Sequence, residues 1–73
     1  MTPYLVHVRI PDFGPSPDGS MTLYVATASS EDEALDLVRA TAPKEWKVVE
    51  VLGRVSEAIA ERRRFQPGTA EQF

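Results

Sequence analysis

The chain has 73 residues and a mass of 8.1 kDa, which is enough for one small domain and not for two. Eleven acidic and eight basic residues give a net charge of −3, which argues against a chain whose main task is to coat nucleic acid or an anionic membrane. The absence of cysteine excludes disulfides, thiolate catalysis and cysteine-based zinc sites. A single histidine is too few for a histidine-rich metal site.

Targeting and membrane signals are missing from the sequence. Residues 1–10 contain no basic leader, no apolar run of signal-peptide length and no small-residue cleavage site. No apolar run reaches the roughly 20 residues that span a bilayer. We therefore expect a cytoplasmic protein without membrane contact. We expect residues 1–66 to form a single small α+β domain and residues 67–73 to form a flexible C-terminal tail.

Three segments have the composition of β-strands. Tyr4–Ile10 is rich in β-branched and aromatic residues, alternates with a period of two and stops before a proline. Met21–Ala28 has the same character, and the stretch Pro11–Ser20 between them, with three prolines and two glycines, predicts a long loop. These two strands are expected to form an antiparallel hairpin. Trp46–Val55 predicts a third strand, in which Gly53 marks a bulge, a bend or an early end.

Two segments predict helices with clear starts. Ser29–Ala42 has Ser30 as its N-cap and Glu33 three residues later, which is the spacing of a capping box. Its apolar residues fall on one face at helical spacing, and a proline follows its last residue. Glu57–Phe65 predicts a short second helix, with Ser56 as its N-cap and arginines in its last turn, where they match the helix dipole.

The predicted elements follow one another in the order β-β-α-β-α. We expect an α+β fold with a three-stranded antiparallel or mixed sheet, the main helix packed on one face and a short C-terminal helix. If the first strand lies between the other two, the second strand, the main helix and the third strand form a split β-α-β unit, which is a ferredoxin-like fragment.

The predicted strands are apolar on both faces, which is more than one helix can cover. In the first strand, for example, Val6 points to one face and Leu5 to the other. The second face therefore needs a cover. Either the C-terminal helix folds back, with Ala58, Ile59 and Phe65 turned inward, or another chain packs there. Domains of this size without disulfides or metals often need to associate, which favours another chain.

The leading hypothesis is a small non-enzymatic module that binds protein or self-associates, with a homodimer or another protein as its assembly. Phe13, an apolar side chain in the expected loop, either anchors the partner or packs beneath the loop. Trp46, Val48 and Leu52 are the apolar side chains that we expect on the uncovered face of the third strand. These four residues form the predicted partner-binding site.

The arginine cluster offers an alternative. A patch that binds nucleic acid has as its candidates Arg62, Arg63, Arg64 and Arg54, with the aromatic residues Phe65 and Trp46. Three consecutive helical residues, however, point over about 200° of the helix circumference and do not form one stripe. The more ordinary interpretation is a solvated helix end whose cations match the dipole, so nucleic acid is not the expected partner.

A small dimeric acid/base enzyme is the second alternative, although we expect no catalytic residue. Its only candidates are His7, Glu50 and Tyr24, which cross-strand pairing would bring together around an interface pocket. The usual role of such a histidine is a hydrogen bond on the less buried face of a strand. The acidic run Glu31–Glu33, with Asp36, predicts a capped, solvated helix start and not a cation site, so neither a metal nor a cofactor is expected.

Overall fold

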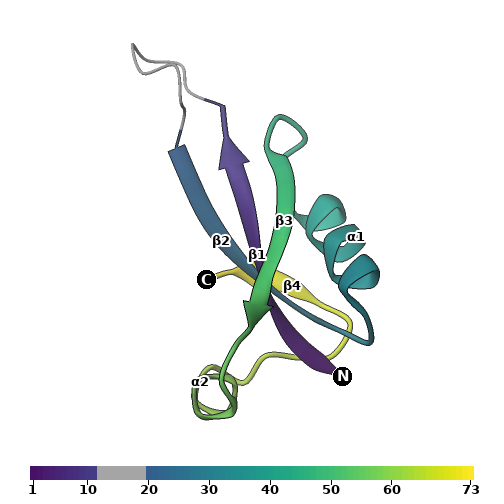
Figure 1. Ribbon diagram of the computed structural model, residues 1–73, viewed down its shortest axis with the longest axis vertical. Coiled ribbons are helices and arrows are strands. Elements are labelled where there is room, and N and C mark those ends of the chain that lie inside the picture. The colour runs from purple at the N-terminus through teal and green to yellow at the C-terminus, as the bar shows by residue number, and fades with distance from the viewer. Residues whose placement is uncertain (12–19) are drawn as a thin grey trace.

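The computed structural model describes residues 1–11 and 20–73 (Figure 1). Its elements follow the order β-β-α-β-α-β. They are β1 (Thr2–Ile10), β2 (Ser20–Ala28), α1 (Glu31–Thr41), β3 (Lys47–Arg54), α2 (Glu57–Arg63) and β4 (Ala70–Gln72). Phe13 and most of the loop expected between the first two strands lie outside the described residues.

The strands form an antiparallel sheet in the order β3-β1-β2-β4. β1 pairs with β2 over its whole length, from Thr2 opposite Ala28 to Ile10 opposite Ser20. On its other side β1 pairs with β3. Because both neighbours run antiparallel to β1, β2 and β3 are parallel to each other. α1 connects them across one face of the sheet, which makes β2-α1-β3 a split crossover around β1 (Figure 1).

The α+β class, the antiparallel sheet and the two helices are confirmed, but the expected three strands and the expected order of elements are wrong. The segment expected to be a flexible tail contains β4, which pairs with the outer edge of β2. Next to this ladder, the Thr27 N–H donates to the carbonyl oxygen of Thr69 at 3.0 Å, and the Phe73 N–H donates to that of Leu23 at 2.7 Å. A strand of three residues is too short for a period-two pattern, so backbone pairing alone defines it.

The hydrophobic core lies between the sheet and α1. In β1, Tyr4, Val6 and Val8 are buried and alternate with less buried residues, as the period of a strand requires. α1 packs Ala34 and Val38 against them, both fully buried. The core cluster consists of Tyr4, Val6, Val8, Tyr24, Ala26, Ala28, Ala34, Val38 and Ala42. We call the side of the sheet that carries these residues the covered face.

α1 begins and ends as its sequence predicts. The Ser30 hydroxyl accepts a hydrogen bond from the Glu33 N–H at 3.2 Å, as in a capping box. The Glu33 carboxylate accepts from the hydroxyl and the backbone N–H of Ser29, one residue before the expected donor. These two bonds, the hydroxyl bond first, lower the pKa of Glu33 below its ordinary value. Ala42 takes an extended conformation before Pro43, which ends the helix.

β3 contains two irregularities that change which side chains face α1. Its register with β1 shifts twice, which leaves Val49 and Leu52 without a partner residue in the ladder. As a result, Val48 and Val51 both pack against the core cluster, whereas strict alternation would place them on opposite faces. The irregularity expected at Gly53 therefore lies one residue earlier.

The expectation that Trp46, Val48 and Leu52 share the uncovered face is wrong, because the first two pack against the core cluster. Val48 lies opposite the buried Val8. The Trp46 ring meets the Tyr24 ring edge-on, with centroids 6.3 Å apart and the planes at 78°. Leu52, by contrast, is 50% exposed. The shifts of register in β3 explain the error, since an odd–even count fails across a bulge.

α2 does not form a second helical layer. Ser56 caps it by accepting a hydrogen bond from the Ile59 N–H at 3.4 Å, and it ends at Arg64, whose φ of 53° is left-handed. None of its residues is buried, and Ile59 is 41% exposed. α2 lies at the end of the sheet where β3 ends (Figure 1). The alternative in which Ala58 and Ile59 turn inward to cover the sheet is therefore wrong, and Phe65, just after the helix, is half-buried.

Candidate functional site

The face of the sheet opposite α1 is the candidate functional site, and we call it the open face. Its side chains come from the strand positions that alternate with the core residues. It includes Leu5, His7, Arg9, Met21, Leu23, Val25, Thr27, Lys47, Glu50 and Glu71.

The middle of the open face is apolar. Leu5 lies opposite Val25 of β2, and Leu23 lies opposite His7. Val25 is 1% exposed, whereas Leu5 and Leu23 are half-buried. Val25 is therefore already removed from water, whereas Leu5 and Leu23 are not. Because α1 lies on the other side and α2 contributes no buried residue, Leu5 and Leu23 remain in contact with solvent.

One end of the open face is basic. Arg9 of β1 lies directly opposite Lys47, the first residue of β3, and both side chains are exposed. Two like charges in facing positions of a ladder raise the local positive potential. We call this pair the basic end.

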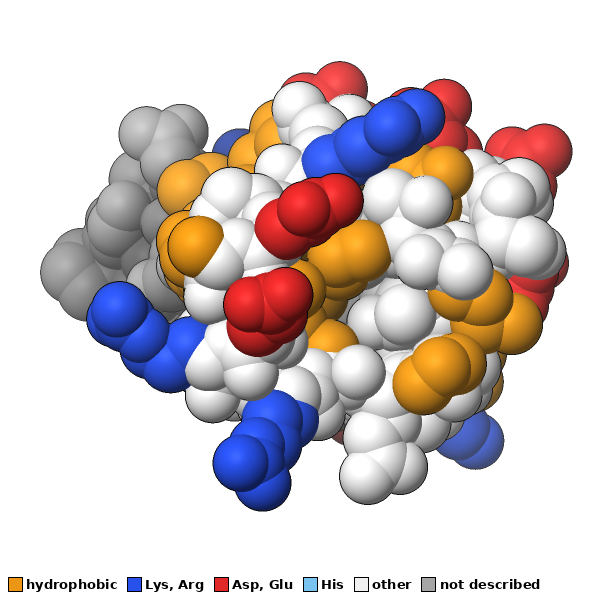
Figure 2. Space-filling view, turned by 90° about the horizontal axis from the view of Figure 1, so that it is seen from below, with side chains coloured by type: hydrophobic (Ala, Val, Ile, Leu, Met, Phe, Trp, Pro, Cys, Tyr) orange, Lys and Arg blue, Asp and Glu red, His pale blue; other side chains and the backbone are white. Residues whose placement is uncertain are grey.

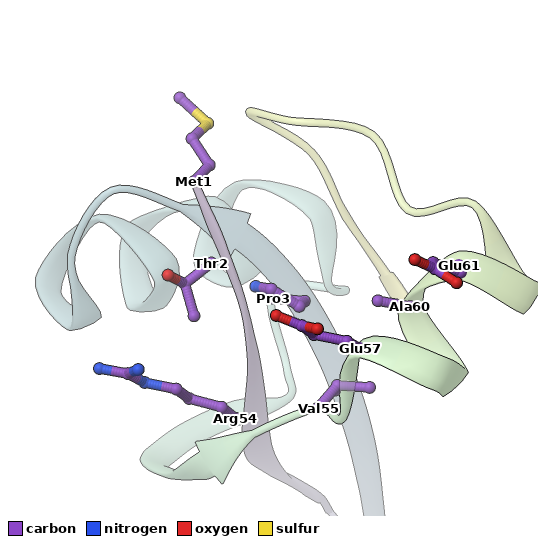
Figure 3. Close-up of a pocket in the computed structure, with 8 residues that line it drawn as sticks. All are labelled: Met1, Thr2, Pro3, Arg54, Val55, Glu57, Ala60 and Glu61. Atoms are coloured by element: carbon purple, nitrogen blue, oxygen red, sulfur yellow. The ribbon is translucent and has the colours of Figure 1, made fainter.

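A cleft of about 450 Å³ lies at the opposite end, between the start of β1, the end of β3 and α2 (Figure 3). Glu57 and Glu61 lie one turn apart on α2 and line the cleft, while the Arg54 guanidinium points away from both carboxylates (Figure 3). From this end of the molecule, acidic side chains border apolar ones (Figure 2). We call this cleft the acidic cleft, and its lining consists of Met1, Thr2, Pro3, Arg54, Val55, Glu57, Ala60 and Glu61.

The three acid/base candidates do not converge. His7 and Glu50 lie opposite each other in the β1–β3 ladder, on the open face. Tyr24 lies opposite Val6 and is buried in the core cluster on the covered face. Adjacent positions in a strand point to opposite sides, so Tyr24 is separated from His7 by the sheet itself. A histidine and an exposed glutamate on an open sheet face do not enclose a substrate.

Arg63 is held between two aromatic rings. Its guanidinium carbon lies 5.4 Å from the centroid of the Phe65 ring and 5.3 Å from that of the Phe73 ring. A cation over an aromatic face is attracted by the ring quadrupole. This contact joins the end of α2 to the end of β4, so Arg63 serves the fold of the C-terminal segment.

The remaining arginines lie on different elements. Arg54 lines the acidic cleft from the end of β3, and Arg62 and Arg64 are exposed at the end of α2. Trp46, the aromatic residue nearest to the start of β3, packs against the core cluster. A surface that binds a nucleic-acid backbone needs several cations on one face and exposed rings beside them. The placement of these residues does not favour that use.

Leu5, Leu23, Glu57 and Glu61 are site residues that the sequence analysis did not single out. Strand parity could have identified the two leucines, because they alternate with the core residues of their strands. The two glutamates are four residues apart in a predicted helix, so a shared helix face could also have been expected. The cleft itself depends on where α2 lies relative to β1, and no local pattern reports that.

Comparisons with protein families, curated proteins and solved structures find no match for this chain. In the part of the chain that the structure describes, no helix is long and apolar enough to cross a membrane. Residues 1–11 and 20–73 also bring together no group of three or more side chains suited to hold a metal ion.

Proposed function

We propose that the protein is a small, non-enzymatic cytoplasmic module that associates with a second copy of itself through the open face. The supporting observation is the apolar centre of that face, where Leu5 and Leu23 remain partly exposed beside the buried Val25. In a sheet with one face in water, each strand normally alternates apolar residues on the core side with polar residues on the water side. Few apolar residues then lie next to one another on the face in water. The size of the chain and its lack of cysteine favour the same proposal.

The area of the open face sets the expected strength of this association. Strands of about nine residues at 3.3 Å each, spaced about 4.8 Å apart, give a face of about 500 Å² per copy. Two such faces bury about 1,000 Å² in total, which is the lower limit for a specific interface. We therefore expect a reversible dimer with a dissociation constant in the micromolar range, formed and broken as the concentration changes.

Sedimentation equilibrium of the full chain, from about 1 to about 500 µM, tests the proposal. We expect the average mass to rise from 8.1 kDa toward twice that value, and the melting temperature to rise with concentration. The variant Leu5→Glu should stay monomeric, because each copy would bring a carboxylate into the apolar centre. Ala40→Glu on the exposed side of α1 adds the same charge elsewhere and should associate as the unmodified chain does.

A second variant distinguishes loss of the contact surface from a folding defect in Leu5→Glu. Leu23→Lys carries the opposite charge at a neighbouring half-buried position, and its far-ultraviolet circular dichroism reports whether the sheet is intact. Loss of association in both folded variants supports the open face as the contact surface. A single 8.1 kDa species at every concentration would overturn the proposed function.

A further inference from the structure

The open face joins two charged surfaces of opposite sign, one at each end. We propose that two copies pack antiparallel, so that the basic end of each copy lies against the acidic cleft of the other. This inference rests on the proposed function, because it names the orientation and the contact residues of the dimer.

The basic end presents Lys47 at the start of β3. Its side chain is exposed. Among the described residues the structure contains an ion pair between Arg39 and Asp36, at 2.9 Å, and none that involves Lys47. Arg9 lies in the facing position of β1 and adds its charge to the same end of the sheet. A partner that approaches the open face at this end meets the exposed ammonium group of Lys47.

The acidic cleft presents two carboxylates from α2. Glu57 and Glu61 are exposed, and neither takes part in an ion pair with a described residue. Pro3, Val55 and Ala60 line the cleft with apolar atoms and leave a cavity of about 450 Å³. The aliphatic part of a lysine side chain fits such a lining, while its ammonium group pairs with the carboxylates at the rim.

A two-fold contact requires both charged surfaces on one side of the sheet. The end of α2 lies toward the open face, because Arg63 packs over the ring of Phe73, whose N–H donates to the carbonyl oxygen of Leu23. Lys47 begins β3, and α2 begins three residues after β3 ends, so the length of that strand separates them. A two-fold axis that lies in the interface at right angles to β3 exchanges the two ends. Each dimer then contains the contact between Lys47 and the pair Glu57 and Glu61 twice.

Charge also excludes the parallel arrangement. If the two copies packed with their strands in the same direction, the two basic ends would lie together at one end of the dimer and the two acidic clefts at the other. The antiparallel arrangement replaces both repulsive contacts with attractive ones. It also enlarges the interface beyond the flat part of the sheet, which alone reaches only the lower limit of a specific contact.

Complementary charge reversal tests this orientation. In Lys47→Glu and in the double variant Glu57→Lys/Glu61→Lys, both end contacts of a homodimer become repulsive, so we expect each variant alone to associate at least about tenfold more weakly. In a mixture of the two, the reversed charge of the Lys47→Glu copy meets the reversed charges on α2 of the other copy. The unmodified residues of both copies form the second contact. We therefore expect the mixture to form a heterodimer of near-normal affinity, measured by native mass spectrometry and sedimentation.

Matched controls separate these contacts from net charge. Lys44→Glu lies in the turn after α1, and Glu31→Lys/Asp32→Lys lies in its first turn, so both repeat the charge changes at residues that belong neither to the open face nor to the lining of the acidic cleft. We expect both controls to associate as the unmodified chain does. The double variant Glu57→Gln/Glu61→Gln keeps the size of the side chains, and circular dichroism verifies that α2 is still present in each variant.

The outcomes distinguish this inference from the proposed function. If Leu5→Glu abolishes association while the reversed charges leave it unchanged, or if the mixture shows no recovery, the antiparallel orientation is overturned and the open face remains the contact surface. If the unmodified chain never associates, the proposed function fails first. Recovery in the mixture, with both controls unaffected, supports the orientation.

Discussion

The two helices of this protein start in the same way and contribute very differently to its fold. Ser30 and Ser56 each cap a helix through a hydrogen bond to the third following N–H, and both helices have acidic first turns and basic last turns. Yet α1 buries Ala34 and Val38, whereas α2 buries no residue. Capping and charge thus determine where a helix forms, and only an apolar stripe makes it a layer of the domain.

The largest expected difference between the helices lies in their apolar side chains. Val38→Ala removes two methyl groups from the fully buried core, and we expect it to lower the free energy of unfolding by about 2 kcal/mol. Ile59→Ala removes more atoms from a side chain that is 41% exposed, and we expect a loss below about 0.5 kcal/mol. Urea denaturation at a low protein concentration measures both. A comparable loss in the two variants would mean that α2 belongs to the core.

Replacing a buried hydroxyl on the open-face side of β2 is expected to raise the free energy of unfolding and not to lower it. Thr27 is 6% exposed, and its Oγ1 has no hydrogen-bond partner among the described residues. Thr27→Val keeps the shape and the backbone hydrogen bonds to Gly68 and Thr69, and we expect it to raise the free energy of unfolding by about 1 kcal/mol. Thr27→Ser, the matched control, keeps the hydroxyl and should be destabilising. Thermal unfolding distinguishes the two, and a destabilised Thr27→Val would show that the hydroxyl has a partner.

The N-caps of the two helices are expected to differ in how much they contribute to global stability. Ser30→Ala should cost about 1 kcal/mol of global stability, because α1 and the core unfold together. Ser56→Ala should cost only a few tenths of a kcal/mol globally, because α2 can open without exposing buried residues. Amide hydrogen exchange tests the reason: the amides of α2 should exchange faster in Ser56→Ala while those of α1 keep their protection. Equal global losses would contradict local opening of α2.

The smallest expected effect is on how the free energy of unfolding decreases as the pH falls. The pKa of Glu33 is lowered in the folded protein, so its hydrogen bonds to Ser29 stabilise the fold above the unfolded pKa and are lost as the pH falls through the folded pKa. Ser29→Ala removes the hydroxyl donor but not the backbone N–H. We expect the pKa of Glu33 to rise toward its ordinary value and the loss of stability in acid to become shallower, as measured by NMR titration of the carboxyl group. An unchanged pKa would assign the shift to the backbone donor.

Local signals were sufficient for most elements. Alternation defined β1 and β2, and the spacing of Ser30 and Glu33 together with a following proline defined α1. Each of these patterns reports on a few neighbouring residues, which is why the sequence alone contains them. The apolar surplus of the sheet could be counted in the same way.

Features that depend on distant contacts could not be predicted. The register shifts at Val49 and Leu52 arise from the pairing of β3 with β1 and leave no period in the sequence. They reversed the expected facing of Trp46 and Val48, and so moved the candidate site from the third strand to the central one. β4 likewise needs the free edge of β2, which exists only once the hairpin and the crossover have formed.

The irregular course of β3 makes this edge of the sheet a poor template for pairing with a strand of another molecule. β3 is an outer strand of the sheet, and its two unpaired residues interrupt the regular row of backbone donors and acceptors that an incoming strand would need. The opposite margin is formed by the three residues of β4, too short a template for stable strand addition. Growth of fibres by continuous pairing is therefore discouraged on both sides, which leaves the face of the sheet as the surface for the association that we propose.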